Sequence, residues 1–305
     1  MKLPVKQLLL VLGATVTIYA AVLLLAGDIS LATLLLRLAS PTGLIAVGLC
    51  VLNFILRGLR WRLWMAHYQR SLGLAEGLRL YLAGYTFTPT PGNIGEAARG
   101  LLLARQPLSP GQSLSIFGAE RVADLLCLLV LCLPGVGWLL LQMPLGLRAW
   151  WPLAALAIGS GAALLTVLFF RFKPALMLRF AWLQDSWQCL SSRPLIWFSL
   201  TVPAWAAQGL AVWLICVDSG LHIDVLLATA FYALAMVGGA LSMLPAGLGG
   251  MEALLTGLLV SHGAAAGVAL GVTLLVRLLT LWLAVAIGAV ALLYSAAIKK
   301  DISLQ

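Results

Sequence analysis

Six ionisable side chains lie inside or beside strongly apolar segments of the sequence: Glu96, Glu120, Arg121, Asp124, Glu252 and Arg277. An ionisable group in the middle of a bilayer costs at least about 2.5–3.5 kcal/mol on insertion scales, so each of them needs a specific role. The planar donor fork of arginine suits a phosphate, which predicts that Arg121 and Arg277 bind one. The four carboxylates are expected to release that phosphate or to carry protons.

Four polar residues are weaker members of the same predicted site: Asn53, Asn93, Arg99 and Gln208. Asn53 and Gln208 fall within apolar runs, where the alternative is a hydrogen bond between helices. A structural alternative also exists for the charged residues. The order Asn93 to Glu96 is typical of a helix N-cap with a carboxylate at its third position, and Gly249 to Glu252 fits the same pattern. Glu120 with Arg121, and Glu252 with Arg277, would then form ion pairs that hold spans together.

Two apolar stretches that carry these residues, about 73–104 and 225–261, are interrupted in the middle by proline and glycine. The residues predicted to make the breaks are Pro89, Pro91, Gly92, Gly95, Pro245, Gly247 and Gly249. Each flank has about 10 to 16 residues, which is too short to cross a bilayer alone. We therefore expect two re-entrant helical hairpins, each entering and leaving on one side, with backbone polar groups satisfied by protein or by a watery cavity.

The two breaks can be superimposed at one offset of 156 residues, which pairs Pro89 with Pro245, Glu96 with Glu252, and Arg121 with Arg277. The same order of span, broken hairpin and span surrounds each break. This predicts a first repeat over 42–133 and a second over 194–293, joined by a connector over 134–193. The connector would contain one span and an interfacial amphipathic segment at about 171–193. Inverted repeats whose broken helices meet near the midplane are typical of secondary transporters.

Composition places these elements in a membrane. The 305 residues are 62% hydrophobic and only 10% charged, against about 25% charged in a typical soluble domain. We therefore predict an all-α polytopic membrane protein in which residues 1–305 form a single transmembrane domain. Besides the two hairpins, six full spans are predicted at about 7–26, 42–62, 113–133, 149–170, 194–217 and 266–293.

The distribution of basic residues predicts an orientation, because lysine and arginine concentrate in cytoplasmic loops. Both termini are then cytoplasmic, and a basic cluster after the second span is also inside; it contains Arg57, Arg60, Arg62 and Arg70. The first hairpin would open to the inside and the second to the outside. Arg37 and Arg148 are exceptions to this assignment.

The sequence argues against several other classes of protein. The net charge of +9 is explained by cytoplasmic loops rather than by nucleic acid. The three histidines are far apart and no Cys-x-x-Cys pair occurs, so neither a metal site nor a cofactor is expected. No nucleotide-binding loop or nucleophile elbow is present.

Paired motifs in the two halves resemble the lysylphosphatidylglycerol synthase transmembrane-region family. The similarity extends from about Asn53 to Gly288, and its motifs are Arg57-x-x-Arg60-Trp61, Pro91-Gly92-x-x-Gly95-Glu96-x-x-Arg99, Glu120-Arg121-x-x-Asp124, Leu244-Pro245-Ala246-Gly247-Leu248-Gly249-x-x-Glu252 and the span of Arg277. The resemblance implies movement of a lipid, with an anionic headgroup, between leaflets. The sequence stops shortly after Lys300 without the aminoacyl-transferase domain of the synthases, so headgroup aminoacylation is not expected.

These observations together predict a lipid flippase of the bacterial inner membrane that works by alternating access and is not an enzyme. Its partner would be a phospholipid or polyprenyl-phosphate type of lipid, with proton or ion coupling and no nucleic acid. A homo-oligomer or contact with envelope-synthesis enzymes is compatible with this prediction. Two alternatives stay open: an intramembrane lipid-modifying transferase that uses paired carboxylates, and a non-catalytic scaffold of an envelope-synthesis complex.

Overall fold

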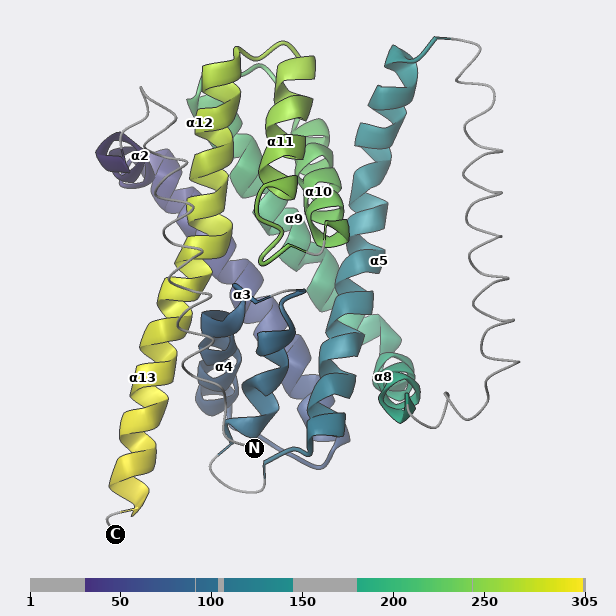
Figure 1. The fold of residues 1–305 in the computed structure, drawn as a ribbon, viewed down its shortest axis with the longest axis vertical. Coiled ribbons are helices and arrows are strands. Elements are labelled where there is room, and N and C mark those ends of the chain that lie inside the picture. The colour runs from purple at the N-terminus through teal and green to yellow at the C-terminus, as the bar shows by residue number, and fades with distance from the viewer. Residues whose placement is uncertain (1–30, 91, 104–106, 145–179, 243, 304–305) are drawn as a thin grey trace.

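The computed structural model describes residues 31–90, 92–103, 107–144, 180–242 and 244–303. Within these ranges the chain is helical and contains no strand. The spans predicted at 7–26 and 149–170, and the break residue Pro91, lie outside the described residues. Figure 1 shows the long helices extending between the upper and lower ends of the molecule at different tilts, with the C-terminus at the lower end.

Four helical segments among the described residues are long and apolar enough to cross a membrane. They are α3 (Pro41–His67), α5 (Pro110–Gln142), α9 (Pro194–Asp218) and the continuous segment Ala266–Ala297. They correspond to the spans predicted at 42–62, 113–133, 194–217 and 266–293. Proline opens α3, α5 and α9, and the side chains of Ser40 and Ser109 cap the first two.

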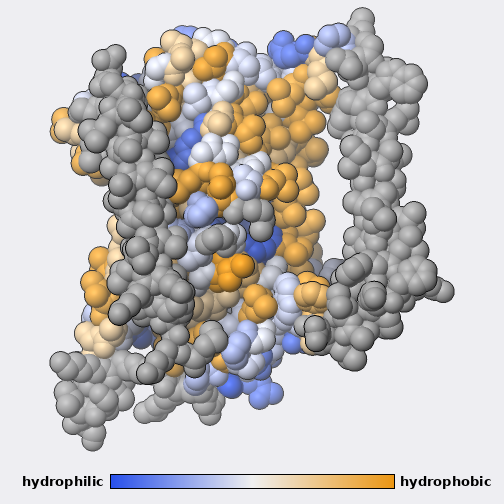
Figure 2. Space-filling view, viewed as in Figure 1, coloured by the Kyte–Doolittle hydropathy of each residue, from blue (hydrophilic) through white to orange (hydrophobic). Residues whose placement is uncertain are grey.

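The helix α5 extends further than the sequence predicts. It passes through Pro134 and ends at Gln142, so it enters the stretch assigned to the connector. The leucine-rich sequence on both sides of Pro134 supplies apolar surface that keeps the chain helical despite the missing backbone donor. In Figure 2 the surface along α5 is apolar over most of its length in this view, and Val122, Leu126 and Leu133 are among its exposed residues.

Both interrupted stretches form two short helical parts around a break. The first consists of α4 (Leu74–Ala83), the 3-10 turn η1 (Gly84–Phe87) and the 3-10 helix η2 (Ile94–Leu101). The second consists of α10 (Val225–Leu241) and α11 (Gly250–Ser261). Figure 1 places α4 in the lower half of the molecule and α10 and α11 in the upper half, with the turn between the latter two near mid-height.

Two shorter helices flank the bundle. The helix α2 (Leu31–Leu38) precedes α3 at the upper end in Figure 1, and α8 (Ala181–Ser192) lies beside α5 at the lower end. The hydroxyl of Ser186 in α8 donates to the carbonyl of Ser115 at 2.7 Å, which fixes α8 against α5. Trp187 and Leu183 are exposed on α8. This helix is the described part of the predicted amphipathic segment, and residues 171–179 lie outside the described ranges.

The last long segment contains a change of helix type. It is composed of α12 (Ala266–Arg277), the π-helical turn η3 (Leu278–Trp282) and α13 (Leu283–Ser303). Short π-helical turns inside α-helices occur frequently at functional sites. Beyond this turn, Gly288 packs directly on η1: a methyl group at its Cα would lie 2.6 Å from the backbone nitrogen of Thr86.

Candidate functional site

The second break is held by one ion pair. Nε of Arg277 donates to Glu252 at 2.7 Å, and Nη2 of Arg277 donates to the carbonyl of Ala246 at 2.9 Å. The other oxygen of Glu252 accepts the N–H of Gly249 at 2.8 Å, as a carboxylate at the third helix position does. The predicted cap from Gly249 to Glu252 is therefore confirmed, and the same carboxylate joins the break to α12.

The first break carries the equivalent pair in a looser form. Nη2 of Arg121 lies 3.4 Å from Glu96, and both pairs join residues 25 positions apart in the sequence. Glu96 accepts shorter hydrogen bonds from Thr88, at 2.7 Å, and from Arg99, at 2.6 Å. The equivalence predicted from the sequence offset is thus visible as a repeated glutamate–arginine pair.

The predicted cap at Asn93 is wrong. Asn93 precedes η2 but has a left-handed backbone with φ of 55°, and its side chain makes no capping hydrogen bond. An N-cap side chain reaches the following N–H groups from an extended backbone, which this conformation does not provide. The N–H of Gly95 is instead satisfied by the hydroxyl of Thr90 at 2.9 Å. Glu96 is consequently free to bind arginine.

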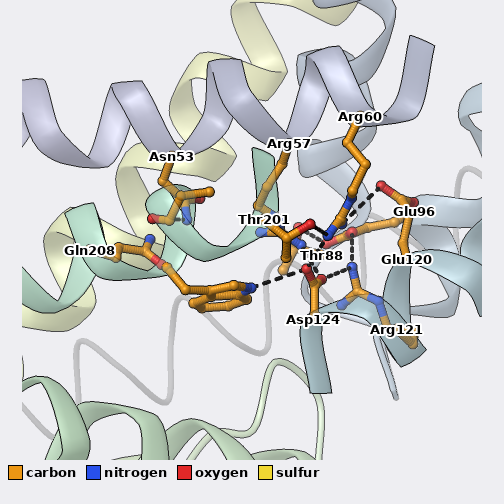
Figure 3. A network of polar contacts seen from close by, with 12 residues as sticks. Asn53, Arg57, Arg60, Thr88, Glu96, Glu120, Arg121, Asp124, Thr201 and Gln208 are labelled. Atoms are coloured by element: carbon orange, nitrogen blue, oxygen red, sulfur yellow. Dashed lines mark hydrogen bonds and ion pairs between the residues drawn. The ribbon is translucent and has the colours of Figure 1, made fainter. Parts of the chain in front are cut away.

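A buried network extends from Glu96 across α3, α5 and α9 (Figure 3). Asp124 is its centre, accepting from Arg57 at 2.8 Å, from Arg60 at 2.7 Å and from the indole N–H of Trp205 at 3.1 Å. Glu120 accepts from Arg99 at 2.9 Å. The ion pair predicted between Glu120 and Arg121 is wrong, because Arg121 contacts Glu96 and Asp124 instead. Because the backbones of several helices converge on these groups, the network fixes the relative positions of those helices.

Two of these arginines have a role that the distribution of basic residues does not predict. Sequence analysis assigns Arg57 and Arg60, with Arg62 and Arg70, to a cytoplasmic basic cluster, and the structure buries Arg57 and Arg60 in α3. The positive-inside rule counts arginines near a span end and does not show whether a carboxylate faces them. The spacing of these residues could have predicted their role. Asn53, Arg57 and Arg60 are four and three residues apart and therefore share one helix face.

The network contains more cations than anions. Its guanidinium groups belong to Arg57, Arg60, Arg99 and Arg121, and its carboxylates belong to Glu96, Glu120 and Asp124. Four against three leaves one positive charge. Several of its donor atoms are also buried without a hydrogen-bond partner among the described residues, including Nε of Arg57, Arg60, Arg99 and Arg121. An anion beside Arg57 and Arg121, the two of these arginines that line a cavity, would balance the excess charge and accept hydrogen bonds from their guanidinium groups.

A partly open cavity of about 80 Å³ lies where the two breaks approach each other. From the first half it is lined by Asn93, Glu96 and Arg121, and from the second by Ala246 and Arg277. The side chain of Arg121 is 32% exposed, against 1% for Arg99 and 0% for Arg60. Arg121 is therefore the arginine of the network that an entering anion reaches first.

The predicted binding residues divide into two groups. Those that line the cavity are Asn93, Glu96, Arg121, Gln208 and Arg277. Those that lie behind it or beside it are Asn53, Arg99, Glu120, Asp124 and Glu252. Arg99, Asp124 and Glu252 each bind a lining residue directly. Sequence reasoning missed several other lining residues, namely Arg57, Tyr85, Thr88, Trp205 and Tyr232. Apart from the spacing of Arg57, no sequence signal distinguishes these residues from ordinary core residues.

Asn53 and Gln208 both join helices. The amide nitrogen of Asn53 donates to the carbonyl of Ala204 at 2.8 Å and thereby connects α3 to α9. The amide oxygen of Gln208 accepts from the hydroxyl of Tyr232 at 3.0 Å and connects α9 to α10. Asn53 thus follows the structural alternative stated for it, whereas Gln208 serves both as a link and as part of the cavity wall.

Comparison with known proteins agrees with the paired motifs. No curated protein matches the sequence significantly. A family model described as "Lysylphosphatidylglycerol synthase TM region" matches residues 9–288, which include both breaks and every residue of the network. The chain is therefore a multi-pass membrane protein that belongs to the lysylphosphatidylglycerol synthase transmembrane-region family, a flippase-like type of membrane domain.

Proposed function

We propose that this protein moves a lipid with an anionic headgroup between the leaflets of the bacterial inner membrane by alternating access to the cavity between the two breaks. The observation that carries the proposal is the position of Arg121 and Arg277. They come from opposite halves of the chain, each beside its own break, and line one cavity. This is where an inverted-repeat transporter places its substrate site.

The two interrupted stretches are proposed to be re-entrant hairpins that open to opposite faces. Their helices have 10, 17 and 12 residues, against about 20 needed to cross a hydrocarbon core. In Figure 1, α4 occupies one half of the molecule and α10 and α11 occupy the other. A movement of either hairpin against the rest of the bundle would open the cavity to one side only, as alternating access requires.

The size of the cavity favours a headgroup over a whole lipid. A buried water needs about 10–15 Å³ of such volume, so about 80 Å³ holds several waters or a compact polar group. The acyl chains of a phospholipid or polyprenyl phosphate would have to lie outside the cavity, against apolar surface such as that of α5. The substrate is then recognised by its anionic end.

The contacts of Arg121 suit reversible binding. Nη2 of Arg121 lies 3.4 Å from both Glu96 and Asp124, which is long for a charge-assisted hydrogen bond of about 2.7–2.9 Å. A phosphate can replace these contacts with shorter ones. The two carboxylates then compete for the guanidinium and promote release. Protonation of Glu96 would couple this competition to a proton gradient, in keeping with the expected ion coupling.

Leaflet transfer in proteoliposomes tests the proposal. Fluorescent phosphatidylglycerol, polyprenyl phosphate and zwitterionic phosphatidylcholine would be compared for their accessibility to a quencher added outside. We expect transfer of an anionic lipid, and roughly a tenfold loss in Arg121→Gln because a charge-assisted hydrogen bond is removed. Arg193→Gln is the matched control, since Arg193 is an exposed arginine at the start of α9.

Two results would reject the proposal. Transfer equal to that of empty liposomes for every lipid would exclude flipping. Equal transfer by the unaltered protein and Arg121→Gln would exclude the assigned role of Arg121. Mass spectrometry of the recovered lipids would show whether any is covalently changed, which is the outcome expected of a lipid-modifying transferase. A scaffold would tolerate Arg121→Gln in cells with no loss of function.

A further inference from the structure

A second cavity lies at the end of the molecule where α9 ends and α12 begins. Its volume is about 230 Å³, nearly three times that of the cavity between the breaks. Arg37 of α2, Ser219 after α9, and Gly267 of α12 contribute to its wall. Because α9 and the segment beginning at Ala266 are candidate spans, their ends lie at the level of the lipid headgroups.

Arg37 provides a positive charge at this cavity. It is exposed, and Nη1 donates to the hydroxyl of Ser219 at 3.2 Å. No carboxylate within the described ranges forms an ion pair with it. Arg37 is also one of the two basic residues that the predicted orientation does not explain. A serine hydroxyl and an arginine fork together make a favourable set of donors for a phosphate.

Apart from Thr33, the rest of the cavity wall is apolar or glycine. Leu34, Val268, Val272 and Leu275 line it beside the glycines of α12. A methyl group placed on Gly267 would have no heavy atom within 4 Å, so the surface there is open. Without a side chain at that position, an extended hydrocarbon chain can lie directly on the helix backbone.

We propose that this groove binds a phosphate-bearing lipid, with the phosphate at Arg37 and Ser219 and one acyl chain along the α12 surface. Charge complementarity selects the occupant: a protein helix would cover the apolar wall but would leave Arg37 without an anion. Inorganic phosphate would satisfy Arg37 and leave the apolar wall uncovered. A phospholipid does both. The site is independent of the proposed transport, because it shares no lining residue with the cavity between the breaks.

Native mass spectrometry of the delipidated full-length protein tests the site. Dioleoyl phosphatidylglycerol would be titrated in, and lipid-bound states counted. We expect Arg37→Gln to weaken one binding event about tenfold, since one charge-assisted hydrogen bond is lost. Gly267→Leu should abolish the same event by filling the groove. Arg193→Gln and Gly257→Leu are matched controls; a methyl group on Gly257 would also have no heavy atom within 4 Å, but this glycine lies on α11.

The outcomes separate this site from the proposed transport site. Repeating the titration in Arg121→Gln should weaken binding at the cavity between the breaks and leave the Arg37-dependent event unchanged. Dioleoylglycerol, which lacks the phosphate, should not bind at the groove. Benzoylphenylalanine in place of Val268 should give a lipid adduct on irradiation. Unchanged binding in both Arg37→Gln and Gly267→Leu would overturn the proposal, as would an adduct only with another part of the chain.

Discussion

The two breaks are each stabilised by a glutamate–arginine pair, but the two pairs differ in distance and in exposure. Both use a glutamate after the break and an arginine 25 residues later. At the second break the pair is isolated and tight, with 2.7 Å between the atoms and only 4% of the Arg277 side chain exposed. At the first break the glutamate is shared among several donors and Arg121 is left with contacts of 3.4 Å. The comparison indicates that the second pair mainly holds structure, whereas the first leaves a guanidinium available to a ligand.

The largest expected effect is at the centre of the first network. Asp124→Asn preserves the shape of the side chain but leaves Arg57 and Arg60 without their shared negative charge. Removing one partner of a buried ion pair costs about 3–5 kcal/mol, so the free energy of unfolding should fall by that amount. Titration with sodium dodecyl sulfate, followed by circular dichroism, measures it. Asp218→Asn, at the exposed end of α9, is the control. A change below about 1 kcal/mol in Asp124→Asn would contradict the assigned importance of the network.

A smaller loss is expected at the second break. Glu252→Gln leaves Arg277 without its carboxylate, but the Glu252 side chain is 16% exposed and water can compensate in part. The free energy of unfolding should fall by about 1–3 kcal/mol. A double-mutant cycle with Arg277→Gln should show that the two losses are not additive, because both changes remove the same contact. Additive losses would mean that the pair is not coupled, and the comparison of the two breaks would then fail.

Arg121→Gln should lower the free energy of unfolding less than Asp124→Asn or Glu252→Gln does. Its contacts are long and its side chain is the most exposed of the network, so the loss should stay below about 1 kcal/mol. The same detergent titration measures this. Combined with a large loss of lipid transfer, a small loss of stability would separate a ligand-binding arginine from a structural one. A stability loss as large as that of Asp124→Asn would show that Arg121 is structural after all.

The smallest expected effect is an increase in the free energy of unfolding. Ala246 has a positive φ of 54°, which costs an L-residue with a β-carbon about 1–2 kcal/mol. Ala246→Gly should relieve part of this strain and raise the free energy of unfolding by about 0.5–1 kcal/mol, while the carbonyl still accepts from Arg277. Ala253→Gly, in the exposed interior of α11, should instead lower it by about 1 kcal/mol. If both variants lose stability, the backbone at Ala246 is not strained.

The sequence was sufficient to predict that Glu96 is equivalent to Glu252 and Arg121 to Arg277, because a fixed offset preserves both residue types and their spacing. It did not predict that Glu96 pairs with Arg121. It was also sufficient for the breaks, since proline and glycine act locally on the backbone. It was insufficient for Arg57 and Arg60, whose roles depend on Asp124, more than 60 residues away. A charge at a span end has the same appearance in sequence whether it faces cytoplasm or a buried carboxylate. The course of α5 through Pro134 depends in the same way on surroundings that local rules omit.

The π-helical turn at Leu278–Trp282 determines which way each residue of α13 points around the helix axis. Each residue added to or removed from a helix rotates the remainder by about 100°. If the same residues formed regular α-helix without a deletion, the segment beyond the turn would rotate by about 100°, and Gly288 would no longer face the backbone of Thr86 in η1. Regular α-helix should therefore be compatible with the contact of Gly288 on η1 only if one residue of Leu278–Trp282 is deleted at the same time.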